Sequence, residues 1–161
     1  MQMHRESENT EAQIVLNREW AANAFSHKLT SLPFSFVYGG RNSAEFMQDW
    51  TCEVRDEKIG DTIDRRTLIL TDPATRLEVC AICLIYLDTP GVDWTVYFTN
   101  TGDKDTPVIE QVKAVDAVFP TGSDTSATLH RLNGSTCAAD DWMPFVAAVA
   151  PVEAIDASPA E

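Results

Sequence analysis

The sequence predicts a mainly β domain with antiparallel strands, preceded by one short helix. Apolar and polar residues alternate over residues 92–99, the period-two pattern of a strand with one buried face. Short turns such as Asp72-Pro73-Ala74-Thr75 and Asp88-Thr89-Pro90-Gly91 separate the expected strands, and no helices lie between them. Consecutive strands joined by short turns pair antiparallel. The expected architecture is an antiparallel β-sandwich or a large twisted sheet.

The N-terminal part has a helical period instead. Within residues 12–27, Leu16, Trp20 and Ala24 recur every four residues, so they are expected to share one helix face. Pro33 then prevents the helix from continuing. Residues 1–11 are expected to be disordered. The sequence therefore predicts a short N-terminal helix that is anchored by Trp20.

The remaining strands follow from composition and turn signals. They are expected at residues 34–38, 51–56, 63–71, 76–87, 107–119 and 127–132. The strand at 76–87 carries apolar residues on both faces, so burial on both sides is expected. From residue 146 the composition becomes rich in Ala, Pro and acidic residues. The domain is therefore expected to span residues 12–145, with a poorly ordered tail at 146–161.

Length and charge restrict the function. A chain of 161 residues is the size of one domain. Its 25 acidic and 12 basic side chains give a net charge of −13, which repels nucleic-acid phosphates and anionic lipid surfaces. A neutral partner such as a sugar is not disfavoured. No signal-type apolar region and no run of membrane-spanning length is present, so the cytoplasm is the expected location.

The motifs of catalysis and metal binding are largely missing. Cys80 and Cys83 form a C-x-x-C pair, but in a strand they point to opposite faces and cannot share an ion. They are expected to be small buried hydrophobes in a reduced compartment. No nucleophile elbow, zinc-protease motif or phosphate-binding loop occurs. The sequence predicts no catalytic residue, no metal and no cofactor.

Two tryptophans next to aspartates are candidates for carbohydrate contact. Trp50 follows Asp49, and Trp142 follows Asp140 and Asp141, each in an irregular segment. An aromatic ring stacks on the C–H face of a pyranose while a carboxylate accepts hydrogen bonds from its hydroxyl groups. The candidate substrate-binding residues are therefore Trp50, Asp140, Asp141 and Trp142. The alternative is that both tryptophans only anchor loops. Trp20 and Trp94 are expected in the core.

Four segments together point to a family. The first two are Pro33-Phe-Ser-Phe-Val-Tyr-Gly-Gly40, with Ser43 and Trp50, and Arg66-Thr-Leu running to Thr71-Asp-Pro73. The others are Asp93-Trp-Thr-Val-Tyr-Phe-Thr-Asn-Thr-Gly102 with Thr106-Pro-Val-Ile-Glu110, and Leu129-His130 with Asn133-Gly-Ser-Thr-Cys137 and Asp140-Asp141. They resemble the start of the N-terminal β-sandwich domain of bacterial α-galactosidases of glycoside hydrolase family 36. The resemblance covers about residues 12–145, and residues 93–110 are its most specific part.

The resemblance implies a supersandwich of antiparallel strands that precedes a catalytic (β/α)₈ barrel. In that family two aspartates on the barrel cleave α-galactosides with retention and without metal, and assemblies of several subunits are common. No βαβ alternation follows Phe119, so no catalytic residue can be carried over to this chain. The family's domain also continues with further strands where this chain turns into its tail. The resemblance thus implies an incomplete sandwich, as in a gene fragment or a split gene.

Three functions follow from these observations. The leading one is a non-catalytic N-terminal domain or fragment of an α-galactosidase-like hydrolase. Its partners would be the catalytic barrel of the same or a split gene product, α-galactosides bound by the intact enzyme, and further copies in a homo-oligomer. The second is a freestanding β-sandwich module that binds carbohydrate or protein. A self-sufficient enzyme built on Asp140 and Asp141 is the third, and neighbouring aspartates fit poorly with the paired carboxylates that glycoside hydrolysis needs.

Overall fold

The computed structural model describes residues 2–29, 32–118, 127–132, 134–135, 137–139 and 141–149. The chain divides into two compact units, Met1–Val118 and Phe119–Glu161. The boundary falls inside the segment 12–145 that was expected to form one domain. The described residues form one α-helix and three antiparallel sheets, none of which is closed, so the prediction of a mainly β antiparallel fold is confirmed. The helix is too polar to cross a membrane.

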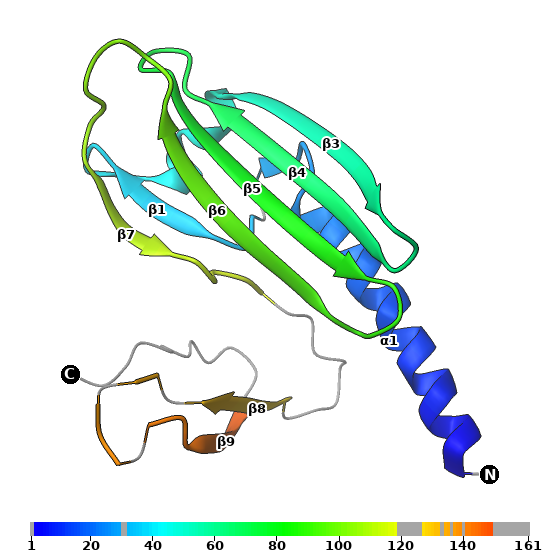
Figure 1. Ribbon diagram of the computed structural model, residues 1–161. Helices are drawn as coiled ribbons and strands as arrows, with labels where there is room; N and C mark the ends of the chain where they lie inside the picture. The colour runs from blue at the N-terminus through cyan, green and yellow to red at the C-terminus, as the bar shows by residue number, and fades with distance from the viewer. Residues whose placement is uncertain are drawn as a thin grey trace. The chain divides into compact units, whose positions relative to one another are not determined.

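Helix α1 runs from Gln2 to Ala24, so it begins well before residue 12, where the four-residue spacing starts (Figure 1). Its C-terminal part packs on the first unit's core through Ala21 and Ala24, and Trp20 contacts Trp94 with ring centroids 5.7 Å apart. Leu16, expected on the same face, is 62% exposed. Only the end of α1 therefore contributes to the core.

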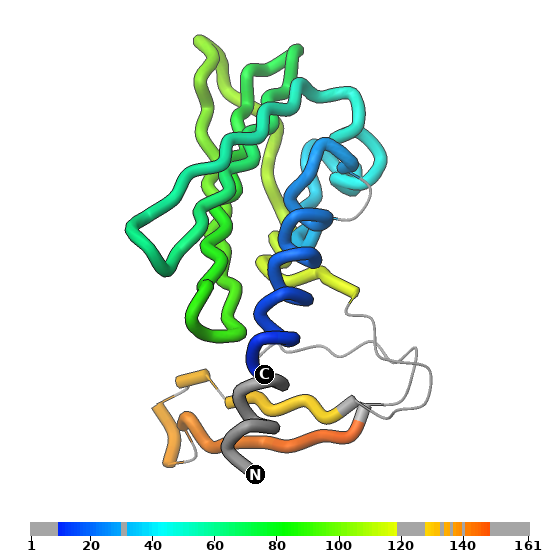
Figure 2. Tube along the Cα trace, turned by 90° about the vertical axis from the view of Figure 1, so that its right-hand side faces the viewer, coloured from blue at the N-terminus to red at the C-terminus, as the bar shows by residue number. Residues whose placement is uncertain are grey.

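The main sheet of the first unit has four strands in the order β3-β4-β5-β6. They are β3 (Thr51–Ile59), β4 (Ile63–Thr71), β5 (Leu77–Tyr86) and β6 (Val92–Asn100), each antiparallel to its neighbours. The expected strands at 63–71, 76–87 and 92–99 are confirmed, and β3 is longer than residues 51–56. Figure 2 shows α1 alongside one face of this sheet.

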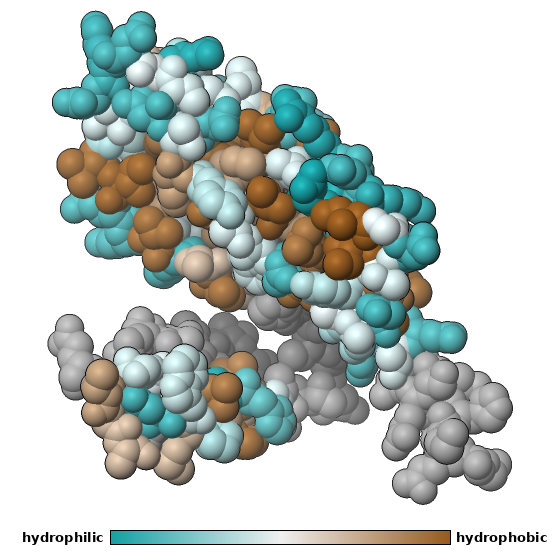
Figure 3. All heavy atoms as spheres, in the orientation of Figure 1, coloured by the Kyte–Doolittle hydropathy of each residue, from teal (hydrophilic) through white to brown (hydrophobic). Residues whose placement is uncertain are grey.

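The two faces of β5 differ in burial. Its inner face, toward α1, is fully or almost fully buried and consists of Leu77, Val79, Ala81, Cys83 and Ile85. Its outer face is only half-buried, although Ile82, Leu84 and Tyr86 lie on it. Burial was expected on both sides of this strand, but only the inner side is fully buried. Apolar side chains lie among polar ones on the face turned to the viewer in Figure 3.

A second, three-stranded sheet has the order β2-β1-β7. Its strands are β2 (Arg41–Asn42), β1 (Ser35–Tyr38) and β7 (Ile109–Lys113). Two short 3₁₀ helices, Ser43–Glu45 and Met47–Asp49, lead from β2 to β3. Asn42 caps the first of them, since its Oδ1 accepts a hydrogen bond from the Ala44 N–H at 3.1 Å. Of the strand expected at residues 107–119, strand β7 forms only Ile109–Lys113, and residue 119 lies outside the described residues.

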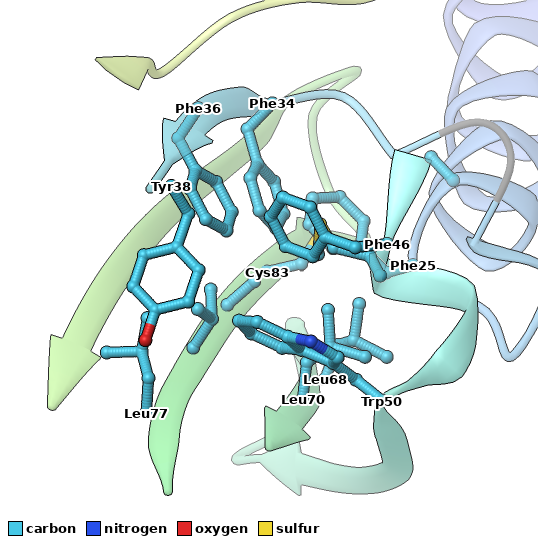
Figure 4. Close-up of a cluster of buried hydrophobic side chains, with 14 of the residues drawn as sticks. Phe25, Phe34, Phe36, Tyr38, Phe46, Trp50, Leu68, Leu70, Leu77 and Cys83 are labelled. Atoms are coloured by element: carbon cyan, nitrogen blue, oxygen red, sulfur yellow. The ribbon is translucent and has the colours of Figure 1, made fainter. Parts of the chain in front are cut away.

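The core of the first unit is aromatic on one side and aliphatic on the other (Figure 4). Most of its aromatic members come from β1 and the segments beside it, Phe25 follows the end of α1, and most of its aliphatic members come from β4 and β5. Phe36 packs edge-on against Phe98 with ring centroids 5.0 Å apart, which ties β1 to β6. Each fully buried Phe or Leu side chain contributes about 1.5–3 kcal/mol. The core therefore holds β1, the 3₁₀ segment and the four-stranded sheet together.

The second unit contains an antiparallel pair of strands, β8 (Ala127–Leu132) and β9 (Pro144–Val149). Strand β8 confirms the expected strand at 127–132. Strand β9 continues past residue 145, where the poorly ordered tail was expected to begin, and residues 150–161 lie outside the described residues. Most described side chains of this unit are exposed. The Arg131 guanidinium covers the Phe145 ring at 5.5 Å.

Candidate functional site

Trp50 lies in the core of the first unit. It is 8% exposed and follows the 3₁₀ turn Met47–Asp49, which directs its ring inward. The ring packs against Phe46, Tyr38 and Phe36 at centroid distances of 5.2, 6.0 and 6.4 Å. A sugar would need one face of the ring free, and these core rings surround a residue that is only 8% exposed. In this conformation Trp50 packs the fold and presents no stacking surface.

Asp141 stabilises the loop between β8 and β9. Its Oδ2 accepts a hydrogen bond of 2.8 Å from the Ser135 hydroxyl, and its N–H donates to the Ala138 carbonyl at 3.2 Å. Short polar side chains often close turns in this way. Asp140 lies outside the described residues. Asp141, the candidate carboxylate beside Trp142, therefore has a structural role in this loop.

Trp142 has the exposure that a sugar-stacking residue requires. Its side chain is 64% exposed, and Met143 beside it is also exposed. Its backbone has φ = 62°, in the left-handed region that a bulky residue rarely adopts. Cys137 in the same loop has φ = 63°. Residues strained in this way cluster at ligand-binding sites. Among the candidates that the structure describes, Trp142 is largely exposed and its neighbour Asp141 is half-buried.

The segments of the first unit that carry the family resemblance meet at one end of its main sheet. The Asp72 carboxylate accepts hydrogen bonds from the Ala74 N–H at 2.9 Å and from the Thr75 hydroxyl at 2.6 Å. The Tyr38 hydroxyl donates to Thr75 Oγ1 at 2.7 Å. The segments Pro33–Gly40 and Thr71–Pro73, distant in sequence, are therefore joined by one chain of hydrogen bonds.

A second connection joins the segments Asp93–Gly102 and Thr106–Glu110 to the same end. The Thr101 hydroxyl donates to the Arg76 carbonyl at 2.6 Å, and the Thr101 N–H donates to the same oxygen at 3.1 Å. The Gly39 N–H donates to the Val108 carbonyl at 3.1 Å. Three of the four family-like segments are thus used to connect turns and strands.

The first unit also has a charged cleft of about 650 Å³ between α1 and the β3–β4 hairpin. Arg66 grips Asp56 with two hydrogen bonds, of 2.7 and 2.8 Å, and donates a third to the Ala22 carbonyl at 3.0 Å. Arg18 approaches Asp64 at 3.5 Å. Sequence reasoning missed this cleft because its charges come from distant segments. Arginines that line the cleft are paired with neighbouring carboxylates, so these charges connect α1 to the β3–β4 hairpin and are not free to bind a ligand.

A smaller cleft of about 420 Å³ lies where α1 meets the segments around β1 and β2. Trp20, Leu29 and Phe34 supply apolar lining, and Asn23 and Asn42 supply amide groups. An apolar surface with a few polar groups is typical of small-molecule sites. The sequence analysis expected Trp20 in the core, from its position in the helical period, and did not predict that Trp20 also lines a cleft.

The cysteines do not form a metal or redox site in the described part of the chain. Cys80 and Cys83 lie on opposite faces of β5, as predicted. Burial raises the pKa of the Cys83 thiol to about 12 and also raises the pKa of Cys52 and Cys80. Among the described residues, no three His, Cys, Asp or Glu side chains are placed to hold a metal ion.

The chain was compared with protein-family models, with curated proteins and with solved structures, and no match was found in any of the three.

Proposed function

We propose that this chain is a non-catalytic β domain of an α-galactosidase-like glycoside hydrolase. In this proposal it supports a separate catalytic barrel and offers Trp142 and Asp141 to the galactoside. The observation that carries the proposal is the 64% exposed Trp142 ring in a left-handed backbone conformation. A large exposed apolar ring in a strained conformation lowers stability, and ligand contact is a physical reason for keeping it.

The use of the family-like motifs supports the non-catalytic role. Tyr38, Asp72 and Thr75 form one hydrogen-bonded chain, and Thr101 bonds to the neighbouring turn. Residues used in this way determine a fold, and they leave catalysis to another part of the enzyme. Such a fold would be shared with the N-terminal domains of the family.

The outer face of the main sheet supports a larger sandwich. Ile69, Ile82, Leu84 and Tyr86 lie half-buried on this face. Apolar side chains at such positions gain stability when a second layer covers them. In the proposal, the antiparallel sheets are parts of a β-sandwich that is completed in the intact enzyme.

A domain exchange tests the proposal. The chain replaces the N-terminal β domain of a family 36 α-galactosidase, and hydrolysis of 4-nitrophenyl α-D-galactoside is measured. Deletion of the domain and its replacement by an unrelated β module of equal length are the controls. We expect a soluble, active chimaera that exceeds both controls. If the unrelated module serves equally well, the proposal is wrong.

The Trp142 contact is tested within that chimaera. Trp142→Ala is expected to lower kcat/KM about tenfold, the effect of losing roughly 1.4 kcal/mol of binding. The matched control is Leu16→Ala, which removes another exposed apolar side chain from α1 and should leave kcat/KM unchanged. Equal effects of the two substitutions would remove Trp142 from the site.

A freestanding carbohydrate-binding module is the second candidate, and the cleft of about 420 Å³ beside Trp20 favours it. Calorimetric titration of the isolated chain with a panel of mono- and oligosaccharides separates the two functions. Binding that Asn23→Ala weakens and Trp142→Ala does not would favour the module. Absence of binding by the isolated chain, together with an active chimaera, would favour the hydrolase domain.

A further inference from the structure

The two edges of the four-stranded sheet differ in their protection against pairing. Five of the nine residues of β3 are charged, namely Glu53, Arg55, Asp56, Glu57 and Lys58. On β6 only Asp93 is charged. Within the described residues, no strand pairs with the outer edge of either one. Charged side chains on an edge strand discourage pairing with other chains. Edge β3 is therefore protected, and edge β6 is open.

Edge β6 also has the regular geometry that a pairing partner needs. Its register with β5 is continuous from Asn100 to Val92, without a bulge, and it contains neither Pro nor Gly. Seven of its nine residues are Val, Thr or aromatic, the residue types that favour strands. Thr95 is exposed, and Tyr97 is 52% exposed. A straight strand of this kind is a template for strand addition.

We infer that β6 pairs with β6 of a second copy of this chain, antiparallel and about a two-fold axis at Val96. Only this centre pairs all nine residues of the strand. It places the single charge, Asp93, opposite the partner copy's Thr99, so that no like charges face each other. On the outer face it sets Thr95 opposite Tyr97, an aromatic and β-branched pair. The sequence of β6 is thus complementary to itself.

The same operation explains why the assembly would stop at a dimer. Each four-stranded sheet uses its open edge, and the joined sheet ends in β3 on both sides. A two-fold interface is closed, since each copy contributes the same strand. Antiparallel self-pairing of β3 about Arg55 would oppose Arg55 to Arg55 and Glu53 to Glu57. The charged edges therefore disfavour further growth.

The experiment uses charge exchange at the two positions that face each other. Sedimentation velocity of the full chain is expected to give twice the mass of 17.8 kDa, in equilibrium with monomer. The double variants T95E/Y97E and T95K/Y97K place like charges opposite each other and should weaken dimerisation at least tenfold. The variant T95K/Y97E places Lys opposite Glu and should restore the dimer.

The outer-face positions of Thr95 and Tyr97 keep the variants foldable, and circular dichroism and the melting temperature confirm folding in each case. Ile59→Glu, on the outer face at the end of the opposite edge, is the matched control and should leave the dimer intact. A wild-type chain that is monomeric at all concentrations overturns the inference. So does a dimer that T95E/Y97E leaves unchanged, or a dimer that T95K/Y97E fails to restore.

Discussion

Gly102 lies directly against the backbone of Thr75: a Cβ atom on Gly102 would stand 2.6 Å from the Thr75 carbonyl oxygen. The loop after β6 is therefore in close contact with the turn before β5. Thr101 donates two hydrogen bonds to the next carbonyl, that of Arg76, whose φ is 66°. The Asn100-Thr-Gly102 motif thus has a steric reason for its glycine, because no side chain fits between the two segments.

Gly102→Ala is expected to destabilise the first unit by about 1–3 kcal/mol, since the backbone must move to accommodate the methyl group. Urea unfolding followed by circular dichroism measures the change. Gly134→Ala is the control, since a Cβ there meets nothing within 4 Å and the change should be within about 0.5 kcal/mol. Equal stability of the two variants would contradict the close contact.

The two candidate tryptophans should differ sharply in their effect on stability. Trp50→Ala leaves a cavity among Phe36, Tyr38 and Phe46, and a loss of about 3–5 kcal/mol is expected. Trp142→Ala removes an exposed ring, so a change within about 0.5 kcal/mol is expected. Thermal unfolding of both variants measures the two losses of stability. A small effect of Trp50→Ala would show that its ring is not part of the core.

The sheet could be predicted from local patterns. The alternation over Val92–Asn100 and the Asp72-Pro73 turn depend on neighbours in sequence, and they gave strands β4 to β6 close to their observed bounds. The start of α1 could not be predicted in this way. Residues 2–11 lack an apolar period, although Glu, Gln, Arg and Met favour helices. A search for one buried face therefore misses them.

The candidate site was predicted only in part, because burial depends on distant contacts. Trp50 and Trp142 have the same local context, a tryptophan after an aspartate in an irregular segment. Phe36 and Tyr38 enclose Trp50, and nothing beside Trp50 in the sequence reveals this. The charged cleft was missed for the same reason, since Arg18 and Asp64 meet only in the folded chain.

Thiol labelling should separate Cys137 from Cys83. Cys137 is exposed, whereas Cys83 is fully buried and has a pKa of about 12. At pH 8 only about one Cys83 thiol in ten thousand would be ionised, and the thiolate is the reactive form. Iodoacetamide is therefore expected to label Cys137 in the native chain and Cys83 only after unfolding in urea. Mass spectrometry of peptides reads the result, and Cys137→Ala is the control.

The pH dependence of stability should report the Asp56–Arg66 pair. The hydrogen bonds from Arg66 lower the pKa of Asp56 below its ordinary value of 3.8. A lowered folded-state pKa gives stability that is fully present above the unfolded pKa and is lost as the pH falls through the folded pKa. Asp56 is 62% exposed, so the contribution is only about 0.5 kcal/mol.

Asp56→Asn is therefore expected to be less stable than the wild type at pH 7, and this difference should shrink as the pH falls through the lowered pKa of Asp56. Arg66→Lys tests the other partner. Lysine keeps the charge but loses the bidentate hydrogen bonding to Asp56 and the hydrogen bond to the Ala22 carbonyl at the end of α1. The free energy of unfolding is therefore expected to fall by about 1–2 kcal/mol. Urea unfolding across the pH range measures both variants. A difference between wild type and Asp56→Asn that does not shrink as the solution is acidified would mean that the ion pair does not contribute to stability, because protonation of Asp56 would then have no effect on it.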